Sequence, residues 1–155
     1  MKKNETTVER KSEREVVITR SFNAPAHIVF EAWTKPELMR RWWVPKSMGM
    51  TLLSCEMDVR TGGTYRFVFP HPSAPEGMAF FGRYLEVSPP SRLVWTNDEG
   101  GDTGQVSTMT LEDRGDTTRM VLHEVYPSRE ACDAGAGAYD GMPESFDQLD
   151  ALLAG

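Results

Sequence analysis

Histidine and carboxylate side chains offer the most direct route to acid–base chemistry, and the chain has three histidines, His27, His71 and His123. His123 is followed by Glu124, and a histidine with a carboxylate partner can serve as a general base. Adjacent residues of a strand point to opposite faces, however, so these two side chains are not expected to pair. A structural role is favoured for the histidines, and the sequence predicts no catalytic residue.

Two further charges, Arg66 and Glu86, stand among apolar neighbours on predicted strands. Either could orient a polar group of a ligand if it faced an interior space, but a solvated outer face is the favoured interpretation. The sequence shows no nucleotide-binding loop, nucleophile elbow or metal-ligand pair, and Cys55 and Cys132 lack the histidine partners of a zinc site. We therefore expect neither a metal nor a cofactor.

Aromatic side chains carry a stronger signal than the charges, since the chain has seven Phe, four Trp and four Tyr residues. Ligand pockets are mostly apolar and aromatic, with a few polar groups that fix orientation. The core of a small domain is aromatic as well, so a core role is the favoured alternative for any single residue. The predicted ligand-contacting residues are Trp33, Trp42, Trp43, Phe67, Phe69, Phe81, Tyr84, Trp95, Met109, Tyr139, Met142 and Phe146.

The overall composition is that of a globular domain: 155 residues, 39% hydrophobic and 26% charged, with a net charge of −6. An acidic chain is a poor general binder of nucleic acid or anionic membranes, because the phosphate field repels it. No apolar run approaches the roughly 20 residues that span a bilayer, and the first residues lack the apolar core of a signal peptide. We expect a cytoplasmic protein with reduced cysteines, no nucleic-acid or membrane partner, and a monomer or homodimer.

The first half of the chain divides into an arm, a strand and two short helices. Residues 1–14 are polar and are expected to form a flexible charged arm, whereas residues 15–155 form a single domain. Glu15–Phe22 alternates and is rich in β-branched residues, which predicts a strand. A helix follows it, in which apolar residues recur at helical spacing.

The second short helix lies in the stretch TKPELMRRWWVPK. Thr34 and Glu37 have the spacing of a capping box at its start, and Pro45 is expected to end it. Trp42 is assigned to the junction between this helix and the sheet. Trp43 lies about 100° around the helix axis and is the better candidate for the rim of a cavity.

The remainder consists of strands followed by one long helix. Six strands joined by short turns favour antiparallel pairing, and with the first strand they make a sheet of about seven strands. A loop over Pro70–Gly77 separates two of them. Ser128 is the predicted N-cap of a C-terminal helix whose apolar residues recur at spacings of three and four. Pro143 is expected to kink this helix and divide it into two pieces.

The long helix must bury its apolar stripe against the sheet, which predicts an α+β fold with a space between the two layers. The glycines Gly135, Gly137 and Gly141 would thin the helix where a ligand could lie. An alternative explanation is that they mark a loose or broken first turn of the helix.

The order of elements, and four stretches in particular, resembles the helix-grip fold of the START-like (SRPBCC) superfamily. Within it the chain is most similar to homologues of the activator of the heat-shock protein 90 ATPase. The stretches are FNAPAHIVFEAWTKPELMRRWW, GGTYRFVF, FFGRYLEVSPPSRLVWT and YPSREACDAGAGAYDGMPESFDQLDALL. Pro143 and the Pro70–Gly77 loop depart from the usual pattern of the family, at the positions expected to border the cavity mouth.

The resemblance implies binding of a small hydrophobic or aromatic molecule in a cavity between the sheet and the C-terminal helix. It leaves two alternatives open. One is a co-chaperone-like or stress-response module that binds another protein, with a chaperone as the candidate partner. The other is a cyclase-type enzyme, which the absence of a visible acid–base pair disfavours.

Overall fold

The computed structural model describes residues 6–44, 52–71, 74–97, 105–134 and 136–154. Within them one antiparallel sheet has the strand order β1-β2-β8-β7-β6-β5-β4-β3. This confirms the α+β helix-grip architecture expected from the sequence. The strands are β1 (Thr7–Arg10), β2 (Glu15–Phe22), β3 (Ser54–Met57), β4 (Thr64–His71), β5 (Ala74–Ser88), β6 (Arg92–Asn97), β7 (Gln105–Asp113) and β8 (Thr118–Val125).

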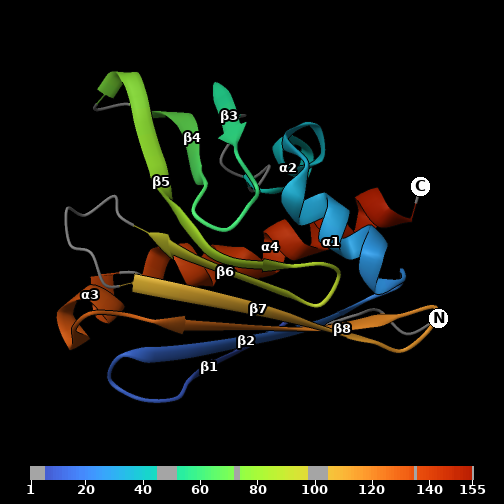
Figure 1. Ribbon diagram of the computed structural model, residues 1–155. Helices are drawn as coiled ribbons and strands as arrows, with labels where there is room; N and C mark the ends of the chain where they lie inside the picture. The colour runs from blue at the N-terminus through green and yellow to red at the C-terminus, as the bar shows by residue number, and fades with distance from the viewer. Residues whose placement is uncertain (1–5, 45–51, 72–73, 98–104, 135, 155) are drawn as a thin grey trace.

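Four helices complete the described chain: α1 (Ala26–Thr34), α2 (Pro36–Trp42), α3 (Arg129–Ala134) and α4 (Ala136–Leu153). Figure 1 shows α4 crossing behind the sheet, while α1 and α2 lie beside the upper strands β3 to β5. Helix α2 contacts α4, α1 and β3, and α4 also contacts β1 and β2. The helices therefore close one face of the sheet, which is concave.

Strand β5 bends the sheet into two parts. It pairs with β4 along one stretch and with β6 along the other, and the β5–β6 register shifts between Tyr84 and Glu86. In Figure 1, β3, β4 and the first part of β5 rise away from the plane of β6, β7, β8 and β2. Gly82 lies so close to the Thr96 carbonyl that a Cβ atom would collide with it. The Tyr65 hydroxyl donates a hydrogen bond of 2.6 Å to the same carbonyl, which fixes the bend.

The core lies on the concave face, because alternate residues of each strand point to it. On β2, Val16, Ile18 and Phe22 are fully buried. They pack with buried residues of β7 and β8 and with Phe146 and Leu149 of α4. The apolar stripe of the last helix is thus buried against the sheet, as its spacing predicts.

The capping box predicted for the second helix is wrong. Thr34 is the last residue of α1, and its hydroxyl donates to the Phe30 carbonyl at 2.8 Å. Lys35 is the N-cap of α2 and makes no side-chain capping bond. Because α1 and α2 follow one another so closely, Thr34 satisfies the end of the first helix instead of the start of the second. The predicted end at Pro45 lies outside the described residues.

The predicted cap at Ser128 is confirmed, since its hydroxyl accepts a hydrogen bond of 3.1 Å from the Ala131 amide.

Strand β1 is an eighth strand that the sequence did not predict. It lies within residues 1–14, which were expected to form a flexible charged arm, and it pairs with β2. The predicted loop over Pro70–Gly77 is shorter than expected, because β4 extends to His71 and β5 starts at Ala74. Helix α4 continues as one element through Pro143, whereas the sequence predicted a division there.

Candidate functional site

Two groups of aromatic rings lie on the concave side near the bend of the sheet. In the first group, Trp33 of α1 lies 4.9 Å from Trp42 of α2 and 5.7 Å from Trp95 of β6, measured between ring centroids. Phe146 of α4 lies 6.1 Å from Trp33 and 6.2 Å from Trp42. Rings from α1, α2, α4 and β6 therefore meet at one place. Trp42 is 1% exposed, and its indole nitrogen donates a hydrogen bond of 3.0 Å to the Ala32 carbonyl.

The second group surrounds Trp43, the residue that follows α2. Its ring lies 5.2 Å from Phe67 of β4 and 5.0 Å from Phe80 of β5. Phe80 stacks on Phe69 with an interplanar angle of 19° and a centroid distance of 5.1 Å. Trp43, Phe69 and Phe80 are only half-buried, although each packs against the buried core. These side chains therefore form an incompletely covered part of the concave face.

The structure brings together ten of the twelve residues predicted to contact a ligand. Six are buried in the core, namely Trp33, Trp42, Phe67, Tyr84, Met109 and Phe146. Four are half-buried against it, namely Trp43, Phe69, Trp95 and Met142. Phe81 does not join them, and the side chain of Tyr139 lies outside the described residues.

Phe81 points away from the concave face and is 40% exposed. Sequence reasoning missed its neighbour Phe80, which is the ring that packs on Trp43. A doublet of phenylalanines does not show which of the two faces inward. The alternation of Phe80 with the buried residues Gly82 and Tyr84 on β5 could have identified the inward ring.

Polar side chains of β7 and β8 lie next to the aromatic groups on the same face. Tyr84 of β5 pairs with Trp95 of β6, and Trp95 pairs with Ser107 of β7, which in turn pairs with Glu124 of β8. Glu124 is 5% exposed and accepts hydrogen bonds from the Ser107 hydroxyl at 3.3 Å and the Tyr126 hydroxyl at 3.0 Å. The Gln105 amide nitrogen lies 3.5 Å from the same carboxyl.

Burial raises the pKa of Glu124 above its ordinary value, although the hydrogen bonds from Tyr126, Ser107 and Gln105 act in the opposite direction. A buried carboxyl that retains its proton can donate a hydrogen bond as well as accept one. Sequence reasoning considered Glu124 only as a partner of His123 and missed this role. The signal was present, because Glu124 follows Met120 and Leu122 on the inward face of β8.

The remaining charges that the sequence singled out lie elsewhere. His123 points to the outer face, where its Nε2 atom lies 2.9 Å from a carboxylate oxygen of Glu15. Arg66 is exposed, and Glu86 accepts hydrogen bonds from Ser88 and Arg92. His27 is exposed, whereas the side chain of His71 lies outside the described residues.

Both cysteines are free thiols. Burial raises the pKa of Cys55 to about 11, so at neutral pH it is not a thiolate nucleophile. Cys132 is fully buried. Among the described residues, no group of three or more His, Cys, Asp or Glu side chains could hold a metal ion.

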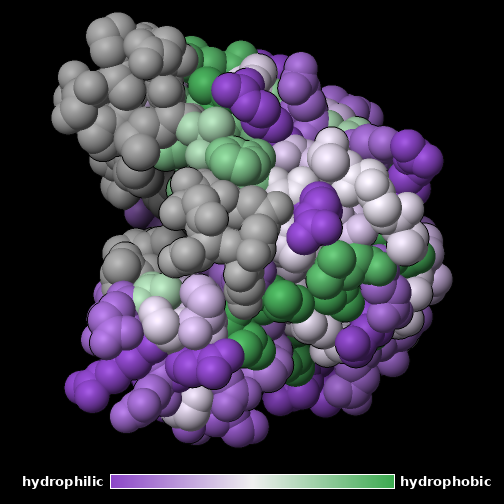
Figure 2. Space-filling model, turned by 60° about the vertical axis from the view of Figure 1, so that its left-hand side comes forward, coloured by the Kyte–Doolittle hydropathy of each residue, from purple (hydrophilic) through white to green (hydrophobic). Residues whose placement is uncertain are grey.

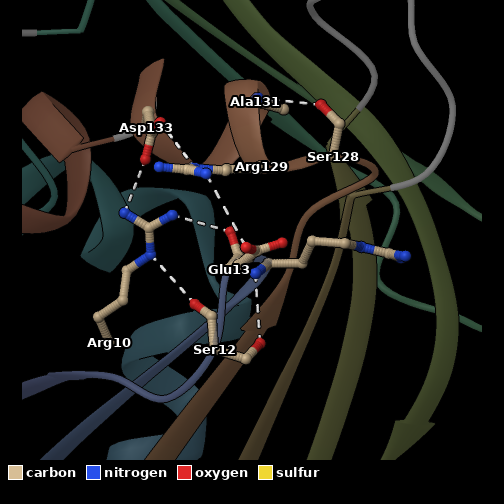
Figure 3. A network of polar contacts seen from close by, with 8 residues as sticks. Arg10, Ser12, Glu13, Ser128, Arg129, Ala131 and Asp133 are labelled. Atoms are coloured by element: carbon tan, nitrogen blue, oxygen red, sulfur yellow. Dashed lines mark hydrogen bonds and ion pairs between the residues drawn. The ribbon is translucent and has the colours of Figure 1, made fainter.

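A separate polar network joins the β1–β2 turn to α3 (Figure 3). Arg10 forms an ion pair of 2.7 Å with Asp133 and donates to the carbonyls of Ser12 and Glu13. Arg129 lies 3.9 Å from the Glu13 carboxylate. The side chains of this network are largely exposed, and the contacts hold the N-terminal hairpin against α3 without forming part of the concave face.

The surface shows no dominant apolar area in the view of Figure 2, where hydrophobic residues form separate groups among hydrophilic ones. In the described part of the chain, Leu53, Phe81 and Leu85 are the exposed large hydrophobic side chains. No helix among the described residues is long and apolar enough to cross a membrane.

A curved antiparallel sheet that holds a C-terminal helix over an aromatic concave face defines a START-type, or SRPBCC, domain of the helix-grip class. The sequence profile of one family of this class, Activator of Hsp90 ATPase homolog 1-like protein, matches residues 23–154. The chain belongs to this family. A search of curated proteins gave no match.

Solved structures share the fold over nearly the whole chain. A protein from Rhodobacter sphaeroides is 25% identical, with a TM-score of 0.85 over 97% of this chain and 98% of its own. Protein CV1439 from Chromobacterium violaceum is 29% identical, with a TM-score of 0.74 over 89% and 96%. Protein Ms6760 from Mycobacterium smegmatis is 23% identical, with a TM-score of 0.81 over 96% and 98%, and shows the fold alone.

Proposed function

We propose that the protein binds a small hydrophobic or aromatic molecule between the concave face of the sheet and α4. The observation that carries this proposal is the set of half-buried rings near the bend, Trp43, Phe69, Phe80 and Trp95. Trp43 follows α2 directly, the other three rings come from β4, β5 and β6, and each ring packs against the buried core. A flat apolar molecule laid against them would cover their remaining exposed area.

The energetic argument concerns apolar area. Removing apolar surface from water contributes about 25 cal/mol per Å², so rings left partly uncovered on a concave face favour a ligand that covers them. The class of fold supports the proposal, since START-type domains often bind hydrophobic ligands. Pockets of this kind combine an apolar lining with a few polar groups, and Ser107 and Glu124 adjoin the rings here.

The test is a thermal-shift titration with naphthalene-type compounds, repeated with two matched variants. We expect a saturable rise in the Tm of the wild-type protein, because a ligand that binds only the folded state stabilises it. Trp95→Ala should abolish most of the rise. Phe81→Ala should retain it, because Phe81 lies on the opposite face and is 40% exposed. An absent shift, or an equal loss in both variants, would contradict the proposal.

The family's description favours a second candidate, an interaction with an Hsp90-type chaperone in the cytoplasm. The exposed side chains of Leu53, Phe81 and Leu85 could contribute to such a contact. An ATPase assay of the chaperone with and without the protein decides this candidate. A changed rate that Phe81→Ala reduces would support it, whereas an unchanged rate would reject it.

A further inference from the structure

The concave face has a polar end, defined here as the side chains of Asn97, Gln105, Ser107, Glu124 and Tyr126. The register pairs Asn97 with Gln105, directly beyond the aligned pair Trp95 and Ser107. Since alternate residues of a strand share a face, Asn97 lies on the same side of β6 as Trp95. The polar end is therefore continuous with the aromatic part of the face.

Two buried atoms beside Trp95 have no hydrogen-bond partner in the part of the chain that the structure describes. One is the indole nitrogen of Trp33, a donor, in a residue that is only 4% exposed. The other is the amide oxygen Oδ1 of Asn97, an acceptor. Leaving a buried polar atom without a partner costs about 1–3 kcal/mol, so such atoms are rare in a native domain.

The Glu124 carboxyl also retains capacity for a further bond. It has three contacts, with Ser107, Tyr126 and Gln105, and a carboxyl group that keeps its proton has an O–H donor beside its acceptor positions. The unused positions at this end therefore include an acceptor on Asn97 and donors on Trp33 and Glu124. A hydroxyl group is both a donor and an acceptor, so it matches this combination better than a group of one kind.

The charge of the polar end favours a neutral ligand. Four of its five side chains are uncharged, and burial disfavours the charged form of the fifth, Glu124. Among the described residues, no lysine or arginine forms an ion pair with Glu124. A charged ligand group would have to lose its water with no opposite charge prepared for it, which is costly.

We propose that the polar end anchors a neutral hydroxyl group, so that the natural ligand is a hydroxylated aromatic molecule and not a plain hydrocarbon or an ion. The ring lies against Trp95 and its neighbours, and the hydroxyl lies between Asn97 and Glu124. This inference rests on the proposed ligand-binding function and specifies the chemical class of the ligand.

The test compares three probes that share one ring system: naphthalene, 2-naphthol and 2-naphthylmethylammonium. Binding to the full chain is followed by quenching of tryptophan fluorescence and checked by calorimetry. We expect 2-naphthol to bind about tenfold more tightly than naphthalene, as one well-formed hydrogen bond allows. The ammonium compound should bind more weakly than either.

Two variants locate the anchor. Glu124→Leu should remove the preference for 2-naphthol and leave the affinity for naphthalene unchanged or higher. Asn97→Leu should do the same, and it keeps the proposal testable if Glu124→Leu fails to fold, because Asn97 Oδ1 has no described partner to lose. Glu112→Leu is the control, since Glu112 is exposed at the β7–β8 hairpin and should preserve the preference.

The possible failures are distinguishable. If naphthalene binds but 2-naphthol binds no better, the anchor is wrong and the proposed binding function stands. If the ammonium compound binds most tightly, Glu124 acts as a buried anion and the neutral anchor is overturned. If no probe binds, both the anchor and the proposed function fail.

Discussion

At the scale of single residues, Glu124 determines the charge balance of the concave face. Its carboxyl is surrounded by neutral donors and is 5% exposed. A structural core would ordinarily place an apolar residue after Met120 and Leu122 on this face of β8. Burying the carboxyl costs free energy that its hydrogen bonds with Tyr126, Ser107 and Gln105 offset only in part.

Glu124 also makes a prediction about pH. Because burial raises its pKa in the folded state, the folded protein holds this proton at pH values where the unfolded chain has released it. Stability therefore falls as pH rises from the ordinary value of 4.5 through the folded pKa, and the cost is absent below 4.5. Glu124→Gln removes this cost, so its stability relative to wild type should increase across that window.

Urea unfolding between pH 4 and pH 8 measures this difference. The matched control is Glu112→Gln, whose side chain is 58% exposed at the β7–β8 hairpin. A stability difference between Glu124→Gln and wild type that is constant with pH would show that Glu124 carries no charge penalty in the folded state.

The adjacent tryptophans give a second prediction. Trp42 is 1% exposed and donates to the Ala32 carbonyl, whereas Trp43 is half-buried. Trp42→Ala should lower the free energy of unfolding by about 3–5 kcal/mol, and Trp43→Ala by about 1–2 kcal/mol. Urea denaturation at one pH compares them, and equal losses would contradict the separate roles assigned to the two rings.

The sequence predicted the orientation of some of these side chains and missed that of others. The spacing within the second helix separated Trp42 from Trp43 correctly, because a helix fixes the angle between neighbouring side chains. The strand doublet at Phe80 and Phe81 did not show that Phe80 is the inward ring, because the phase of a strand depends on its partners. Glu124 was missed because a charged residue next to a histidine was considered only as a pair.

At the scale of elements, α4 is attached to β2 by a charge cluster in which only the arginine is fully buried. Arg20 is 2% exposed and forms ion pairs with Asp147 at 2.8 Å and Asp150 at 3.0 Å. It also donates to the Thr6 hydroxyl. The two aspartates lie three residues apart on α4, which places both on one face of the helix. One arginine therefore fixes the rotation of α4 over the sheet.

Replacing Arg20 with methionine should lower the free energy of unfolding by about 2–3 kcal/mol, because both aspartates lose their ion pair with the guanidinium. The loss should stay below that of a fully buried pair, since Asp147 is 46% exposed. Arg92→Met is the control: its pair with Glu86 is exposed, and the change should stay within about 0.5 kcal/mol. Urea denaturation measures both, and equal effects would contradict a tethering role for Arg20.

Elements were predictable from local patterns, whereas their ends depended on neighbours. The Ser128 cap follows from one side chain and was confirmed. The Thr34 capping box failed because α1 ends where α2 begins, and the same hydroxyl bonds backward to Phe30. The bulge between Tyr84 and Glu86 was not predicted, since it depends on the register that β5 keeps with β6.

At the scale of the whole molecule, the bend in β5 creates the concave face. The antiparallel order and the helix over the sheet followed from short turns and from the apolar stripe of the last helix. The bend that makes this face concave could not be predicted from the sequence. It depends on the close approach of Gly82 to the Thr96 carbonyl, which no sequence pattern shows. Among the described strands, β5 is the one that pairs with both parts of the sheet, so a molecule held at the bend would contact both.

This arrangement predicts where a ligand should protect the chain. Binding of 2-naphthol should slow amide hydrogen exchange in β4 and β5, which carry Phe69 and Phe80, and at the end of α2 next to Trp43, more than in β1. The reason is that a ligand across the bend suppresses local opening of the upper part of the sheet, while β1 is the strand at the opposite edge. Hydrogen–deuterium exchange with mass spectrometry measures this, with Trp95→Ala as the variant that should lose the protection. Uniform slowing over all strands would indicate stabilisation without a site at the bend, and slowing confined to β1 and β2 would place the ligand elsewhere.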